Sequence, residues 1–456
     1  MPKSLSGGPR RSYAIPLLVL AVAAAGFNLR TAITSLPPLF PDLETRLHLS
    51  SAALSLLAAT PVICFGVVSA FAAWLNRRFG EEAILLVALG VLTAGLLLRG
   101  ADPGILLFPG TALAASAIAI LNVLLSSMVK RRWPERAGFL IGIYLTALSV
   151  GAILSSLISV PLYRSSGGSV PLALGLWAAP AALVMLLWLP QLRYRGAGSL
   201  ATAAPAASAV VPATGRIKIY RYALTWQVTA FMGLQSLLYY AALSWLPTIF
   251  QDRGSSPVAA GNLLALMGVG NLATSLLVPV LAHRTPGQRA LVVPSLVGTA
   301  VGLAGSLWAP LGQAPLWVLV LGISQGSCLG LAIFFMMARA PNPGVAASLS
   351  AFSQSVGYLV ASAGPLEVGL LHTVTGSWDI PVGLLLVLSA CELAIGLLAA
   401  RPLVLPAVTM TPVPSPAGPG GPGGPGGPGG PGPGGTGGRN PPVSGGFPGG
   451  RPPGAS

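Results

Sequence analysis

The chain has 456 residues, of which 53% are hydrophobic and only 8% are charged. Soluble domains carry about a quarter charged residues, so a water-soluble fold of this composition could not bury its apolar surface. The formal net charge of +15 would suit a nucleic-acid-binding protein, but the basic residues cluster between long hydrophobic stretches. The composition therefore indicates an integral membrane protein with no nucleic-acid partner.

A membrane-spanning helix needs roughly 20 predominantly apolar residues. Twelve segments fit this requirement, and many are separated by charges or Pro/Gly pairs such as "NRRFGEE", "KRRWPER" and "ARAPNPG". The first follows Arg10 and Arg11 and could pass for a signal peptide, but it is needed to make the number of spans even. We expect helices over 13–38, 51–75, 82–99, 105–128, 138–162, 170–190, 222–247, 258–282, 290–309, 316–338, 346–371 and 380–400.

The basic residues divide unequally between the two sides of the membrane that these spans define. With the amino terminus inside, inner segments carry 20 of the 25 Lys and Arg residues, and outer segments carry four, Arg46, Arg99, Arg164 and Arg253. Lys and Arg are enriched in cytoplasmic loops. We therefore predict a multi-pass protein of the plasma (inner) membrane with both termini cytoplasmic.

The longest interior connection divides the chain into two halves. "LPPLFPD" at 36–42 is echoed by "LPTIFQD" at 246–252, an offset of 210, and each follows the first span of its half. Parallel six-helix repeats with a site between them are typical of transporters. We expect a cytoplasmic amino terminus over 1–12, six-helix bundles over 13–190 and 222–401, and a cytoplasmic linker over 191–221.

Residues 402–456 differ in composition from the rest. The run "GPGGPGGPGGPGGPGPGG" has glycine at every third position for a few triplets, as collagen does, but it is short and loses register. Such Gly/Pro-rich sequence cannot build a packed core. We predict a disordered cytoplasmic tail.

Arg30 is the one basic residue that this topology leaves inside a span. An arginine at the bilayer centre costs at least ~2.5–3.5 kcal/mol and normally faces a bundle interior or a wet cavity. It could reach outward to the membrane surface, pair with a helix carboxyl end, lie over an aromatic ring, or clamp an anion with its planar donor fork. The spans offer no obvious acidic partner, because Glu367 lies near an outer end and Glu392 lies in the last span.

Several spans carry polar groups near mid-depth. Gln235 and Tyr239 lie four residues apart and share a helix face, as do Gln354 and Tyr358, and Tyr240 is the repeat equivalent of position 30. Taken singly, each Gln or Asn could serve only a hydrogen bond between helices. Together they predict a cavity for a small planar anion or polar heteroaromatic, with substrate-binding residues Asn28, Arg30, Gln235, Tyr239, Tyr240, Gln325, Gln354 and Tyr358. Asn122 and Tyr144 offer further polar groups in the fourth and fifth spans.

Three stretches carry a family resemblance. "NLRTAITSLPPLFPDLETRLHLSSAALSLLAATPVICFG", "GLQSLLYYAALSWLPTIFQDRGSSPVAAGNLL" and "SQSVGYLVASAGPLEVGLLHTVTGSWDIP" resemble the cyanate and nitroimidazole permease family of the major facilitator superfamily, from about residue 14 to 400. The resemblance implies an all-α membrane fold of twelve helices in two six-helix halves, with alternating access to a central site. It also implies small, often anionic substrates, with Asn28 and Arg30 as the first-span signature and Gln235, Tyr239 and Tyr240 as the seventh-span one.

The leading functional hypothesis is a secondary transporter of a small organic anion or polar aromatic. A multidrug-type exporter is the alternative, and a non-transporting membrane receptor ranks below both because the chain offers no output domain. The sequence has no nucleotide-binding loop and no Ser/His/Asp or metal-ligand cluster, so we expect neither an enzyme nor a cofactor or metal. Protons are a candidate coupling partner through Glu367 or Glu392, while export and facilitated diffusion fit equally well.

Overall fold

The computed structural model describes residues 14–101, 103–132, 134–189, 218–285 and 287–406. All regular elements in these ranges are helices, which confirms the predicted all-α fold class. The amino-terminal segment 1–12, most of the linker 191–221 and the tail beyond 406 lie outside the described residues. The domain boundaries placed there remain predictions.

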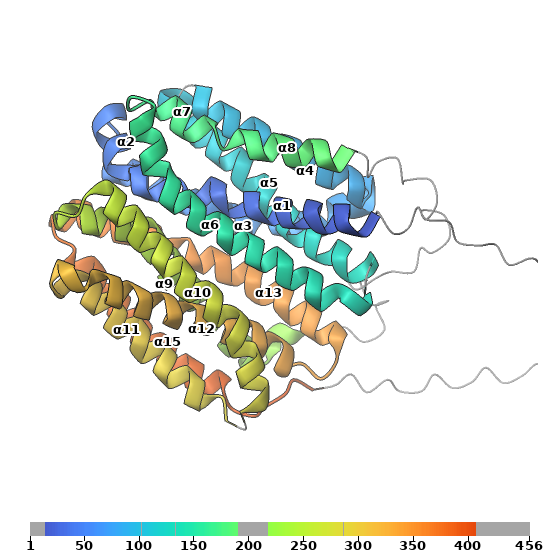
Figure 1. The fold of residues 1–456 in the computed structure, drawn as a ribbon. Coiled ribbons are helices and arrows are strands. Elements are labelled where there is room, and N and C mark those ends of the chain that lie inside the picture. The colour runs from blue at the N-terminus through green and yellow to red at the C-terminus, as the bar shows by residue number, and fades with distance from the viewer. Residues whose placement is uncertain (1–13, 102, 133, 190–217, 286, 407–456) are drawn as a thin grey trace, which may run out of the picture. The chain divides into compact units, whose positions relative to one another are not determined.

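Helices α1 to α8 make up the first half of the chain and are drawn from blue to green in Figure 1. Each expected span of this half coincides with one helix or with a broken series of helices. The elements are α1 Ala14–Thr34, η2 Pro37–Leu39, α2 Phe40–Leu47, α3 Ser51–Phe79, α4 Glu81–Ala101, α5 Pro103–Arg132, α6 Ala137–Ser165, α7 Val170–Gly175 and α8 Ala178–Trp188.

Helices α9 to α15 make up the second half, drawn from yellow-green to red in Figure 1. The eleventh expected span is broken near Ser362 into two helices. The elements are α9 Ala223–Asp252, α10 Pro257–Arg284, α11 Arg289–Trp308, α12 Ala314–Ala338, α13 Pro343–Ala361, α14 Ala363–Thr375 and α15 Asp379–Ala399.

Within the described ranges, ten segments are long and apolar enough to cross a membrane. The remaining two of the twelve expected spans, α9 and the pair α13–α14, are too polar to be among these ten segments. Both carry a Gln and a Tyr one turn apart, Gln235 with Tyr239 and Gln354 with Tyr358. Helix α9 is also buried along most of its length, so it faces protein rather than lipid and does not need a fully apolar surface.

The same helix pairings recur in both halves. In the first half α1 packs on α6, and α5 packs on α3 and α4; in the second half α9 packs on α13, and α12 packs on α10 and α11. Close approach of α12 to α10 depends on Gly322, Gly326 and Gly330, spaced four residues apart. A Cβ on Gly322 would clash with the Met267 carbonyl oxygen, as expected where small residues let membrane helices pack closely.

The two halves meet at the end of the bundle that holds Phe40 and Trp245, which we call the outer end after the predicted topology. The rings of these two residues lie 5.7 Å apart, edge to face. Gln251 Nε2 donates to the Pro38 carbonyl oxygen at 3.3 Å. Toward the inner end of α6, by contrast, a Cβ on Gly138 would meet nothing within 4 Å.

The structure corrects the prediction that Arg99 lies in an outer surface segment. Arg99 belongs to α4 and is fully buried. Its Nη1 donates to the Ala32 carbonyl oxygen at 2.7 Å, and its Nη2 to Ser35 Oγ at 3.4 Å. Because the last carbonyl groups of a helix have no partner within it, Arg99 caps the carboxyl end of α1.

Candidate functional site

Arg30 lies in α1 and reaches across to the second half of the protein. Its Nη1 donates to Tyr239 Oη at 3.3 Å. The guanidinium carbon also lies 5.4 Å from the Tyr239 ring centroid and 5.7 Å from that of Tyr240, both within cation–π range. Such contacts contribute about 0.5–2 kcal/mol each. They offset part of the cost of placing arginine in the membrane interior.

The rings around Arg30 form one cluster with members from three helices. Tyr239 and Tyr240 lie 5.3 Å apart on α9, and Tyr240 lies 6.4 Å from Tyr358 of α13. Phe65 of α3 completes the cluster, 5.7 Å from Tyr358 and 6.5 Å from Tyr240. We call these four residues with Arg30 the arginine–aromatic cluster.

Tyr144 of α6 joins the surroundings of Arg30 from the first half. Its hydroxyl donates to Asn122 Oδ1 of α5, and the side chain lies within electrostatic range of Arg30. A Cβ on Gly26 would lie 2.8 Å from the Tyr144 carbonyl oxygen and 3.0 Å from its ring. Glycine at position 26 therefore lets α6 bring Tyr144 against α1.

The electrostatic character of the cluster is that of a cation without a counterion. Within the described ranges, Arg30 has its polar contacts with tyrosine side chains and none with a carboxylate. A guanidinium has five N–H donors, and the hydrogen bond to Tyr239 uses one of them. The site can therefore attract an anion and offer it further hydrogen bonds.

The structure brings together four of the eight predicted binding residues, Arg30, Tyr239, Tyr240 and Tyr358. Arg30 contacts Tyr239 and Tyr240, and Tyr240 contacts Tyr358. Gln235 is buried one turn before Tyr239, and its Oε1 accepts from Ser236 Oγ at 3.2 Å. Gln354 lies one turn before Tyr358 and is exposed. Its position on the same helix face leaves it at the edge of the arginine–aromatic cluster.

Asn28 and Gln325 make no hydrogen bond to the cluster among the described residues. Asn28 is two residues from Arg30, so it faces another direction on α1, and its Nδ2 donates to Ala24 O at 2.8 Å and Pro180 O at 3.4 Å. Gln325 is buried in α12, and neither atom of its amide has a hydrogen-bond partner among the described residues. Phe65 was not predicted, because one phenylalanine in an apolar span carries no sequence signal.

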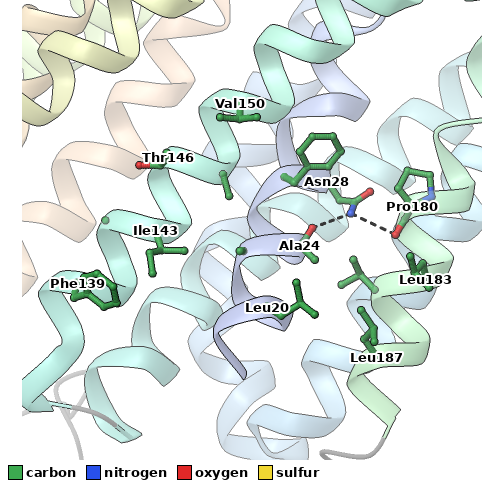
Figure 2. A pocket seen from close by; sticks show the side chains of 15 residues that line it. Leu20, Ala24, Asn28, Phe139, Ile143, Thr146, Val150, Pro180, Leu183 and Leu187 are labelled. Carbon is green, nitrogen blue, oxygen red and sulfur yellow. Dashed lines mark hydrogen bonds between the residues drawn. The ribbon is translucent and has the colours of Figure 1, made fainter. Parts of the chain in front are cut away.

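Asn28 instead borders a lateral groove between α1, α6 and α8, shown in Figure 2. The groove has a volume of about 720 Å³. Its walls are almost entirely apolar, with Leu20, Phe139 and Leu187 among the lining residues. This groove is separate from the arginine–aromatic cluster and offers little polar recognition.

Comparisons with known proteins place the chain among transporters. The family model described as Major Facilitator Superfamily matches residues 18–365. The chain is 38% identical to an uncharacterized transporter of Bacillus subtilis, YycB, over 81% of this chain and 90% of that protein. It is 35% identical to the 2-nitroimidazole transporter of Escherichia coli, over 87% of this chain and 98% of that protein.

Two further matches extend the comparison to a third relative and to a solved structure. The cyanate transport protein CynX of Escherichia coli is 28% identical over 79% of this chain and 91% of that protein. The solved structure of a bacterial homologue of the human lysosomal transporter Spinster, inward-facing and unoccupied, matches with a TM-score of 0.68 and 17% identity, over 87% of this chain and 98% of that one. The matches confirm the family resemblance and the fold class predicted from the sequence.

Proposed function

The chain belongs to the Major Facilitator Superfamily, and from that premise we propose that it is a secondary active transporter of a small organic anion or polar aromatic. Cyanate and nitroimidazoles are the substrates that the names of two relatives suggest. The observation that carries the proposal is Arg30, a cation inside the bundle whose polar contacts in the described residues are tyrosines.

The energetics of a half-buried cation inside the membrane support anion binding at Arg30. The two ring contacts compensate only part of the cost of burial. A bound anion supplies the opposite charge, and hydrogen bonds to charged groups contribute about 1.5–3 kcal/mol. The flat faces of Tyr239, Tyr240 and Tyr358 favour a planar ligand, such as an aromatic carboxylate or a nitro-substituted ring.

Alternating access supplies the transport step in this proposal. The halves are in contact at the outer end through Phe40, Trp245 and Gln251, so the present conformation suits entry from the inner end. Rocking of the halves would break these contacts and expose the cluster outward. We place the protein in the plasma membrane with both termini cytoplasmic, as the distribution of Lys and Arg predicts.

The test is uptake by the purified full-length protein in liposomes. Labelled cyanate, 2-nitroimidazole and benzoate are the probes, with benzamide as the neutral match for benzoate. We expect saturable movement of at least one anionic or nitro-substituted probe, with benzoate preferred over benzamide. Equal movement of benzoate and benzamide would contradict the anion site.

A multidrug-type exporter is the second candidate, and the lateral groove is the observation that favours it. An apolar volume of about 720 Å³ suits a lipophilic compound that enters from the bilayer. This candidate predicts export of tetraphenylphosphonium that does not depend on Arg30. Export of that cation by the Arg30→Ala variant, together with no transport of benzoate by the wild type, would favour it over the anion transporter.

A further inference from the structure

One carboxylic acid and one amide in the second half of the chain are buried with no hydrogen-bond partner for any side-chain polar atom among the described residues. Glu392 of α15 and Gln325 of α12 have exposed fractions of 0% and 1%. Neither carboxyl oxygen of Glu392 and neither amide atom of Gln325 has a hydrogen-bond partner among the described residues. More than about 90% of buried polar groups in proteins are paired, so these four atoms need an explanation.

Glu392 faces the interior of the second half rather than lipid. Gly396, one turn later on the same face, packs so closely that a Cβ would lie 2.9 Å from the side chains of Phe231 in α9 and Val292 in α11. Ser389, about one turn earlier, donates to the Leu296 carbonyl oxygen at 3.5 Å. The carboxyl group therefore lies in the seam where α15 meets α9 and α11.

The same seam reaches α12. Cys328 of α12 lies within electrostatic range of Glu392, and Gln325 lies one turn from Cys328 on the same side of that helix. Gln325 therefore lies one turn from the α12 residue in electrostatic range of Glu392, and no hydrogen bond joins the two side chains among the described residues. A neutral amide can accept the proton of a carboxylic acid or donate to a carboxylate.

The surroundings decide the charge of Glu392. An isolated carboxylate is so costly in an apolar interior that the group takes up a proton instead. Helices α9, α11 and α14 pack on α15, and Cys328 of α12 is the titratable group that faces the carboxyl. Within the described ranges, no charged side chain lies in electrostatic range of Glu392, and Glu367 of α14 is exposed.

We infer that Glu392 is a proton-binding site that couples transport to protons. This inference rests on the proposed function, in which the anion binds near Arg30. The Glu392 carboxylate takes one proton from water on one side of the membrane and releases the same proton to water on the other side. Helix α9 links the two sites, because it packs on α15 and carries Tyr239 and Tyr240. One proton carried with one monovalent anion makes the cycle electrically neutral.

The first test measures protonation without transport. Infrared difference spectra of the full-length protein in lipid, recorded across a pH titration, should show a protonated carboxyl band at neutral pH. The Glu392→Gln variant keeps the shape of the neutral acid and should lose that band, whereas Glu367→Gln should keep it. An unchanged band in Glu392→Gln would overturn proton binding at this residue.

The second test measures coupling in liposomes with labelled benzoate, cyanate and 2-nitroimidazole. For one proton per anion, a gradient of one pH unit supports accumulation of up to about tenfold. We expect this accumulation from the wild type and from Glu367→Gln. In Glu392→Gln it should fall to about onefold, while exchange of labelled for unlabelled probe, which moves no net proton, continues.

The outcomes separate this inference from the proposed function. Accumulation by Glu392→Gln equal to that of the wild type would overturn the coupling role. Wild-type transport that does not depend on the pH gradient would overturn it as well. Both results leave the transporter proposal intact. Wild-type protein that moves none of the probes would overturn the proposed function and the coupling together. Accumulation driven by a sodium gradient instead of a pH gradient would assign coupling to a different cation and overturn the inference.

Discussion

Arg30 Nη1 donates to Tyr239 Oη at 3.3 Å, joining residues 209 positions apart in the chain and in opposite halves of the protein. Tyr240, the repeat equivalent of position 30, lies beside this contact with its ring centroid 5.7 Å from the guanidinium carbon. Equivalent positions of two parallel repeats lie at the same depth, so they can meet where the halves face each other. A ligand at Arg30 would therefore touch both halves at once.

Removing the Arg30 side chain should weaken binding of the anionic probe. Loss of a charged hydrogen-bond donor costs about 1.5–3 kcal/mol, which corresponds to roughly 10–150-fold weaker benzoate binding by Arg30→Ala. Arg30→Lys keeps the charge but loses the planar donor fork, so its affinity for benzoate should lie between those of the wild type and Arg30→Ala. Calorimetric titration of the purified proteins measures the change.

Arg46 provides the matched control for Arg30. It also lies over a tyrosine ring, 5.5 Å from the centroid of Tyr163, but it is exposed at the outer end. Arg46→Ala should bind benzoate with wild-type affinity. A similar loss of affinity in both variants would show that general charge, rather than the position of Arg30, attracts the anion.

The two parts of the Tyr239 side chain can be separated by substitution. Tyr239→Phe removes the hydroxyl that accepts from Arg30 but keeps the ring, so we expect about 1 kcal/mol of loss, or roughly fivefold weaker binding. Tyr239→Leu also removes the cation–π contact, so its benzoate-binding free energy should weaken by up to about 2 kcal/mol more. Equal affinities of the Phe and Leu variants in the same titration would argue against a role for the ring.

Much of the fold could be predicted because the bilayer imposes a length on each apolar segment. The expected spans coincide with helices, and the prolines at 37 and 38 follow the end of α1 at Thr34. The pairing of Arg30 with the tyrosines of α9 was also within reach, because the repeat offset placed Tyr240 opposite position 30. The facing of Asn28 could also be predicted, because it lies two residues from Arg30 on the helix and turns to Pro180, yet it was still placed among the binding residues.

Arg99 shows what the sequence could not reveal. Its position near the end of an expected span suggested a surface charge, yet its partners are the Ala32 carbonyl and Ser35, which lie 67 and 64 residues earlier. A backbone carbonyl carries no sequence signal. Arg339 makes the same kind of contact, because its Nε donates to the Ala399 carbonyl oxygen at the end of α15. Arginines near helix ends therefore serve as caps for neighbouring helices as well as topological signals.

Replacing Arg99 should destabilise the first half of the protein. Arg99→Ala leaves the buried Ala32 carbonyl without its donor, which costs about 1–3 kcal/mol, and it also empties space in the core. Arg99→Lys should recover part of this loss, because an ammonium group can still reach one acceptor. Unfolding in mixed detergent micelles measures the free energy, with the exposed Arg164→Ala as the control that should match the wild type. Equal stability of Arg99→Ala and wild type would refute the capping role.

Substitution of Gly261 in α10 would test whether packing at the outer end holds the two halves together. A Cβ there would lie 2.7 Å from the Ser156 carbonyl oxygen of α6, closer than real Cβ contacts. Since backbone atoms cannot yield as a flexible side chain does, Gly261→Ala should push the outer ends of α6 and α10 apart. Spin labels at Arg164 and Ser255, on a cysteine-free background, should then report a larger share of long distances. Gly138→Ala on α6 would meet nothing within 4 Å and should leave the distribution unchanged; an identical distribution in Gly261→Ala would show that this contact does not control closure.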